Sequence, residues 1–142
     1  FWHGMPDLDA RNEAVTREIE DISRLWLTEM GAAGLRLDAI RHLIEEEEKQ
    51  SSTPSTIAWL EKYNAFLKTV EPSAFTVGEV WSETSDIKRY IPKALDSAFE
   101  FWLAEAIGSS IEKGTGAGGV RARIEEVRAS YDPERSGDFY VV

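Results

Sequence analysis

The sequence has no cysteine. This absence excludes a disulfide framework and a zinc site built from thiolates, but it does not fix the cellular compartment. No run of about 18 apolar residues occurs, so we expect no segment that spans a membrane. No cationic start followed by an apolar run is visible, so no signal peptide is indicated. A soluble protein of the cytoplasm or a secreted one both remain open.

Positive charge is also scarce. The chain has 16 Lys and Arg residues against 26 Asp and Glu residues, which gives a net charge of −10. An acidic chain repels phosphate backbones, so we predict no sequence-independent binding to nucleic acid. Aromatic side chains are plentiful instead, and the 142 residues suit one packed domain with an aromatic-lined site. We expect Trp26, Trp59 and Trp102 in its core.

Helices and strands are predicted to alternate along the chain. The spacing of apolar residues predicts helices over 12–30, 53–70, 86–90, 103–113 and 120–130. Short apolar runs predict buried strands over 35–40, 74–81, 95–101 and 138–142. This alternation is typical of βα units, with a parallel sheet covered by helices. A closed eight-stranded barrel takes about 250 residues, so we expect roughly half of one, in a piece of a longer chain.

Two carboxylates interrupt two of the predicted strands near their C-terminal ends. They are Asp38 and Glu79, which lie 41 residues apart in the sequence. In βα barrels the active site lies at this end of the strands. Neighbouring strands are about 4.8 Å apart, so the two carboxyl groups could lie near 5 Å, the spacing of a retaining glycosidase. The spacing alone does not single out sugars as substrates.

Other interpretations of these acidic residues remain open. An Asp at the end of a strand often caps a loop, and carboxylates at successive strand ends can hold Mg²⁺, as in a metal-dependent barrel enzyme. Arg36 lies two residues before Asp38 and therefore points to the same face of the strand. The two could form a structural ion pair, or Arg36 could keep Asp38 ionised and oriented, as a nucleophile requires.

Three motifs resemble those of one enzyme family. The chain reads GLRLDAIRH at 34–42, GEVW at 78–81 and MPDLD at 5–9. In this order and with these gaps they are similar to motifs of the α-amylase family of glycoside hydrolases (family 13): those of the fourth strand, the fifth strand and the end of the inserted domain, respectively. The resemblance covers essentially the whole chain.

This resemblance implies a fold and a domain organisation. The implied fold class is α/β, a partial TIM (β/α)8 barrel from roughly the fourth strand to the seventh, preceded by the third barrel helix. Residues 1–11 would be the end of the inserted domain or a loop, and residues 12–142 would form part of the catalytic barrel.

The resemblance also implies roles for the matched residues. Asp38 would be the nucleophile that forms a covalent glycosyl-enzyme intermediate, and Glu79 the general acid and then the base that activates water. Arg36 would hold Asp38 ionised. The substrate-binding residues would be Arg36, Arg41 and His42 in the glucose-binding cleft, with Trp81 stacking on a sugar ring at its border.

The implied activity is hydrolysis of α-glucosidic bonds in starch-like α-glucans with retention of configuration, so the expected partner is an α-glucan or maltooligosaccharide. The family's third catalytic carboxylate and its third-strand motif are missing from the chain, so we expect the isolated fragment to be inactive. The alternatives are a transglycosylase or oligosaccharide α-glucosidase of the same family, a metal-dependent barrel enzyme, and a non-catalytic fragment.

No cofactor or metal site is predicted from the residues present. In some family members the backbone carbonyl at the position of His42 binds calcium, so calcium stays an open alternative for the full-length protein. The sequence does not indicate an oligomeric state.

Overall fold

The computed structural model describes residue 4, residues 7–131 and residues 139–140. Within them, four parallel strands form one sheet in the order β1-β2-β3-β4. This arrangement confirms the predicted α/β class with a parallel sheet. Residues 138, 141 and 142 of the last predicted strand, and Met5 and Pro6 of the first motif, lie outside the described residues. The strands are β1 (Gly34–Leu37), β2 (Phe75–Gly78), β3 (Ser97–Phe99) and β4 (Phe139–Tyr140).

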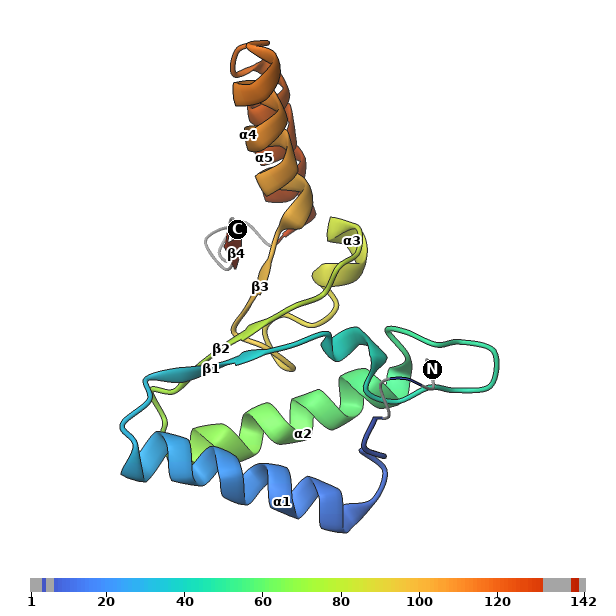
Figure 1. The fold of residues 1–142 in the computed structure, drawn as a ribbon, viewed down its shortest axis with the longest axis vertical. Coiled ribbons are helices and arrows are strands. Elements are labelled where there is room, and N and C mark those ends of the chain that lie inside the picture. Colours follow the sequence, from blue (N-terminus) through green and yellow to red (C-terminus); the bar gives the residue numbers. More distant parts are fainter. Residues whose placement is uncertain (1–3, 5–6, 132–138, 141–142) are drawn as a thin grey trace.

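A helix occurs at or beside each of the five predicted places, but the one predicted over 86–90 runs instead over Thr84–Ile87, and residues 88–90 form a turn. A π-helical turn, η1 (Leu25–Glu29), extends the first helix, and a 3-10 turn, η2 (Ile40–His42), follows β1. Helices α1 and α2 lie side by side on one side of β1 and β2, and α4 and α5 form a hairpin at the other end of the molecule (Figure 1). The helices are α1 (Glu13–Arg24), α2 (Pro54–Val70), α3 (Thr84–Ile87), α4 (Phe101–Lys113) and α5 (Gly118–Ser130).

Local sequence explains where the two longest predicted helices begin. The Asn12 side chain accepts a hydrogen bond of 2.9 Å from the backbone N–H of Ala14, and the Thr53 hydroxyl accepts one from the N–H of Thr56. Such N-caps satisfy backbone donors that the first helical turn leaves unpaired. Pro54 at the first helical position costs the helix no hydrogen bond, because a backbone N–H at this position would have no partner within the helix.

The strands are shorter than the sequence predicts, and this changes where the acidic residues lie. β1 ends at Leu37 and β2 at Gly78, and these two residues pair across the ladder. Asp38 and Glu79 therefore come directly after the strands rather than within them. Beyond Asp38 the chain leaves the extended conformation, because Ala39 has a φ of 45°.

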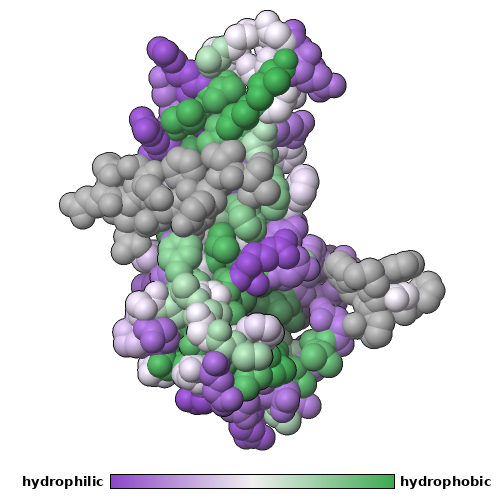
Figure 2. All heavy atoms as spheres, turned by 60° about the vertical axis from the view of Figure 1, so that its left-hand side comes forward, coloured by the Kyte–Doolittle hydropathy of each residue, from purple (hydrophilic) through white to green (hydrophobic). Residues whose placement is uncertain are grey.

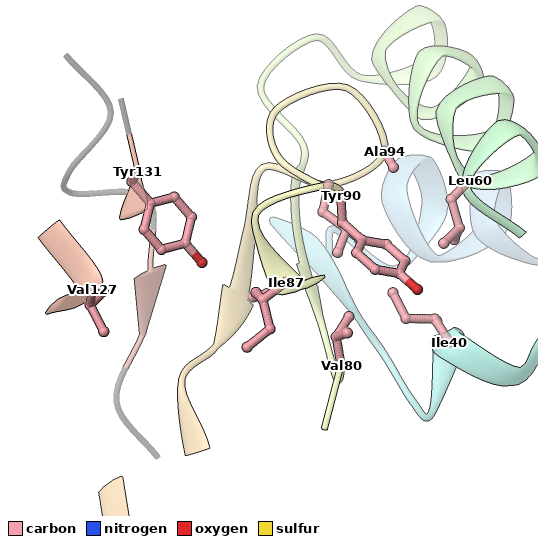
Figure 3. Close-up of a cluster of buried hydrophobic side chains, with 10 residues drawn as sticks. Ile40, Leu60, Val80, Ile87, Tyr90, Ala94, Val127 and Tyr131 are labelled. Atoms are coloured by element: carbon pink, nitrogen blue, oxygen red, sulfur yellow. The ribbon is translucent and has the colours of Figure 1, made fainter. Parts of the chain in front are cut away.

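The main core lies between the sheet, α2 and α3. In Figure 3 Tyr90 lies near Leu60, Ile40 and Val80, all of which are buried. The hydroxyl of Tyr90 donates a hydrogen bond of 2.9 Å to the Ser52 side chain, so its one polar atom is satisfied. A second cluster, under α1, contains Leu27, Tyr63, Leu67 and Ala74.

The prediction that Trp26 lies in the core is wrong, because its side chain is 49% exposed. The adjacent Leu27 takes the inward position against α2, and neighbouring residues of a helix point about 100° apart. Trp59 and Trp102 are partly buried. Apolar side chains also lie exposed at the far end of the molecule, where Figure 2 shows them in green at the top, over the α4–α5 hairpin that includes Ile111.

No helix among residues 7–131 is long and apolar enough to cross a bilayer.

Gly78 allows the end of β2 to approach the core closely. A Cβ atom at this position would collide with the side chains of Leu95 and Ile40. Because Glu79 follows Gly78 directly, this close packing also bears on where the Glu79 carboxylate leaves the sheet.

We therefore expect Gly78→Ala to destabilise the full-length protein by about 1–3 kcal/mol through overpacking. Gly108→Ala is the matched control, since Gly108 lies within α4 and a Cβ there meets nothing within 4 Å. The control should be neutral or stabilising, because Ala favours helix. Chemical denaturation of both variants checks this, and equal stability of the two would contradict it.

Candidate functional site

Arg36, Asp38 and Glu79 meet at the C-terminal edge of the sheet. The Arg36 Nη1 atom lies 2.5 Å from Asp38 Oδ1, and its Nη2 atom lies 2.5 Å from Glu79 Oε2. The parallel register explains this meeting: Leu37 pairs with Gly78, so the next residue of each strand leaves the sheet at the same level. One guanidinium therefore contacts both carboxylates, which lie on the same rim.

The two carboxylates differ in their exposure to solvent. The Asp38 side chain is 72% exposed, whereas the Glu79 side chain is 23% exposed. Glu79 also holds its backbone in the ladder, because its N–H donates a hydrogen bond of 2.8 Å to the carbonyl of Leu37. Two acids in unequal surroundings suit a pair in which one attacks as an anion and the other transfers a proton.

Arg41 braces two loops. From η2, its Nη1 donates to the backbone carbonyl of Trp81, and its Nη2 donates to the Ser51 hydroxyl at 3.0 Å. Its own carbonyl accepts a hydrogen bond from the N–H of Ser52. Within the described residues, no ion pair joins Arg41 to Asp38 or Glu79. The side chain thus contacts the backbone of Trp81 rather than the carboxylates.

His42 is half-buried beside this brace. Its Nδ1 lies 3.0 Å from the carbonyl oxygen of Gln50, and because a carbonyl only accepts, Nδ1 is the donor. This contact ties the 3-10 turn to the far end of the loop that contains the acidic run at 45–48.

The exposed ring of Trp81 begins a row of aromatic side chains. It is 55% exposed and stacks on Phe101, with ring centroids 4.3 Å apart. Phe101 in turn lies 5.8 Å from Phe99, whose ring centroid is 5.9 Å from the guanidinium carbon of Arg36. The row therefore leads from the candidate stacking surface to the charged group between the carboxylates.

Phe99 and Phe101 are absent from the predicted site residues. They lie in and directly after a strand that was predicted only from its apolar character. The signal that could have found them is the alternation Phe99-Glu100-Phe101 at the end of β3, which puts two rings on one face.

Asp86 supports the brace from α3. Its carboxylate accepts hydrogen bonds from Ser52 at 2.7 Å and pairs with Arg89 at 2.6 Å. Burial alone would raise the pKa of Asp86, but the hydrogen bonds from Ser52, Arg89 and Ser82 outweigh it and hold the pKa below its usual value. The backbone N–H of Ser52 donates to the carbonyl of Arg41. Asp86 is therefore linked to Arg41 through Ser52.

Because the pKa of Asp86 is depressed in the folded state, its contribution to stability is present above about pH 4 and is lost as the pH falls through the folded value. Asp86→Asn should lower the free energy of unfolding at pH 7 by about 1–2 kcal/mol. The difference from the unmodified protein should shrink below pH 4. Unfolding curves of the full-length protein at pH 7 and pH 3.5 measure this, and a difference that is constant with pH would contradict it.

No metal centre is evident in this part of the molecule. Among residues 7–131, no three His, Asp or Glu side chains converge as a ligand set for a metal ion. Between Asp38 and Glu79, the cation in contact with both is the guanidinium of Arg36.

A parallel sheet whose strands alternate with helices along the chain defines an α/β protein. Comparison with known families is more specific: residues 1–127 match the model of the alpha-amylase catalytic domain. The chain therefore belongs to the alpha-amylase family, which confirms the resemblance of the motifs.

Individual relatives agree with this assignment. Alpha-amylase 3 of Dictyoglomus thermophilum is 36% identical over 111 residues, which cover 78% of this chain and 21% of that protein. An amino acid transporter heavy chain of Homo sapiens is 35% identical over 121 residues, or 80% of this chain and 17% of that protein. The chain thus spans about a fifth of the length of these relatives. The names of the two relatives indicate different functions.

Solved structures show the same fold. An alpha-amylase from H. orenii superposes with a TM-score of 0.77 at 29% identity, over 99% of this chain and 28% of that one. An alpha-amylase from Geobacillus thermoleovorans complexed with acarbose gives a TM-score of 0.73 at 23% identity, over 93% of this chain and 27% of that one. The described sheet and helices therefore match part of an alpha-amylase barrel.

Proposed function

We propose that the protein to which this chain belongs is a retaining glycoside hydrolase that cleaves α-glucosidic bonds in starch-like α-glucans. The observation that carries the proposal is the pair of carboxylates, Asp38 and Glu79, held on one guanidinium at the ends of adjacent strands. Membership of the alpha-amylase family supports it. The acarbose complex of the Geobacillus amylase supports an α-glucan as the ligand class.

In the proposed reaction, the ionised carboxylate of Asp38 attacks the anomeric carbon while Glu79 gives its proton to the departing glycosidic oxygen. This step forms a covalent glycosyl-enzyme and releases the first sugar. Glu79, now ionised, takes a proton from water, which attacks the anomeric carbon and frees Asp38. Arg36 orients Asp38 through its contact of 2.5 Å. Arg36 must release Glu79 when the substrate binds, because the protonated carboxyl of a general acid binds a cation only weakly.

The binding residues have separate tasks in this proposal. Trp81 offers an exposed aromatic face for a sugar ring, and Arg41 holds the backbone of Trp81 in place. His42 lines the cleft at the turn after β1, with its Nδ1 committed to the carbonyl of Gln50.

We also propose the numbering of the barrel. β1 to β4 correspond to its fourth to seventh strands, and α1 with η1 to its third helix. Residues 12–142 then belong to the catalytic barrel and residues 1–11 to the end of the inserted domain. The apolar stripe Ile22, Leu25, Trp26 and Met30, exposed on α1 and η1, suits burial against the preceding barrel unit.

Three alternatives remain beside this proposal. A metal-dependent enzyme would place a cation between the carboxylates, where Arg36 already lies, and carboxylates clamped on an arginine are poor metal ligands. A non-catalytic member of the family is favoured by the name of the human relative, a transporter heavy chain. A transglycosylase or an oligosaccharide α-glucosidase would use the same two acids.

Substitution of the two acids tests the proposal. In the full-length protein, Asp38→Asn and Glu79→Gln should each lower starch hydrolysis by at least about a hundredfold, because each removes a group that forms or breaks a bond. Release of reducing ends from starch measures this, with Asp21→Asn and Glu105→Gln as controls. These two controls are carboxylates exposed on α1 and α4.

Full activity in either site variant would contradict hydrolysis by this pair. Inactivity of the unmodified full-length protein would favour the non-catalytic alternative. Loss of activity in a chelator that Mg²⁺ restores would favour a metal enzyme. Products from starch and from short maltooligosaccharides separate a hydrolase from a transglycosylase or an α-glucosidase.

The isolated 142-residue chain should release no measurable sugar from starch. Its described sheet has two open edges, at β1 and β4, and it spans little more than a quarter of the amylase structures that it matches. A cleft built from only part of a barrel lacks the remaining walls that orient a substrate. A reducing-sugar assay on the purified chain checks this, and hydrolysis above the background of a Glu79→Gln chain would contradict it.

A further inference from the structure

Phe99 lies beside the cation that holds the two acids. It is the last residue of β3, and its ring centroid is 5.9 Å from the guanidinium carbon of Arg36. This is within the distance at which the negative face of an aromatic ring attracts an arginine. Arg36 is a long side chain that is half exposed, so it has many rotamers available and needs a support to stay in one of them.

The position of Phe99 is fixed by the buried residue that follows it. Glu100 is fully buried, pairs with Arg123 at 2.9 Å, and accepts a hydrogen bond of 3.0 Å from Thr84. Arg123 also donates to the Thr84 hydroxyl at 2.8 Å. A buried ion pair resists displacement, because moving one partner leaves a charge uncompensated. The end of β3 is therefore anchored to α3 and α5.

A second contact restrains the Phe99 ring from its own segment. Phe101 lies 5.8 Å from Phe99 in a tilted arrangement, and its other neighbour is the stacked ring of Trp81. Tilted and stacked pairs are favourable geometries for aromatic rings. Phe99 is thus held by the Glu100 network through the backbone and by Phe101 through the ring.

We propose that Phe99 is a positioning residue that holds the Arg36 guanidinium where it contacts the nucleophile, Asp38. The inference rests on the proposed hydrolytic function of that pair. With the ring in place, Arg36 is directed to Asp38. Without the ring, Arg36 samples solvent-facing rotamers and the nucleophile loses its charge partner for part of the time. The expected effect falls on the chemical step, because Arg36 contacts the nucleophile directly.

The test uses three variants of the full-length protein. Phe99→Leu keeps an apolar side chain but removes the ring, and it should lower kcat on starch about three- to tenfold with little change in KM. Phe99→Tyr restores a ring and should recover most of kcat. Phe66→Leu is the matched control, since Arg24 lies 5.2 Å from the Phe66 ring on the outer helices, and it should leave kcat unchanged.

A graded change of the ring separates this role from packing. Replacing Phe99 by 4-fluoro- and then 3,4,5-trifluorophenylalanine withdraws charge from the ring face with little change of shape, so kcat should fall stepwise with fluorination. This series also decides the matter if Phe99→Leu does not fold. A kcat that is constant across the series, or equal losses in Phe99→Leu and Phe66→Leu, would overturn the positioning role.

The outcome is distinguishable from failure of the proposed function. If the unmodified protein hydrolyses starch and loses activity in Asp38→Asn while the fluorinated series is flat, only the role of Phe99 is wrong. If the unmodified protein does not hydrolyse starch, the proposed function fails and the role of Phe99 fails with it.

Discussion

The arrangement of the site depends on one shared cation. Asp38 and Glu79 leave adjacent strands at the same level, so their carboxyl groups are neighbours. Two neighbouring carboxylates repel each other when both are ionised. Arg36 offsets this repulsion because its planar guanidinium presents separate nitrogens to the two carboxylates, which a lysine ammonium does less well. The same geometry explains why Arg36 must come from β1 itself: two positions before Asp38, it shares that residue's face of the strand.

The level at which the acids emerge is a property of the sheet. Parallel pairing of Leu37 with Gly78 and of Gly78 with Ala98 places the ends of three strands in line. Asp96 secures part of this register, because its carboxylate accepts hydrogen bonds from Thr76 on β2 and pairs with Lys68 of α2 at 2.7 Å. A shift of one residue would turn every side chain of the strand to the opposite face. Contacts remote from the acids thus determine whether the acids meet.

Much of this could be predicted from the sequence, because apolar spacing, Asn12 and the Thr53-Pro54 pair are local signals. The pairing of Asp38 with Glu79 was also predictable, since strand ends in a parallel sheet share one edge. The end of the first strand could not be predicted from the sequence. The 3-10 turn that begins two residues after Asp38 has no strong sequence signal. The contacts of Phe99 with Arg36 and of Arg41 with the Trp81 carbonyl were not predictable, because each joins residues that lie at least 40 positions apart in the sequence.

Under the proposed function, Arg41 serves binding indirectly, through the loop that carries Trp81. The loop after β2 is held from two sides, since Arg41 donates to the carbonyl of Trp81 and the indole N–H of Trp102 donates to that of Ser82 at 3.1 Å. Phe101 supports the ring of Trp81 from beneath. A side chain already fixed in its binding position loses little entropy when a ligand arrives, so more of the contact energy appears as affinity. An aromatic surface prepared in this way suits a sugar ring, which offers few strong contacts of its own.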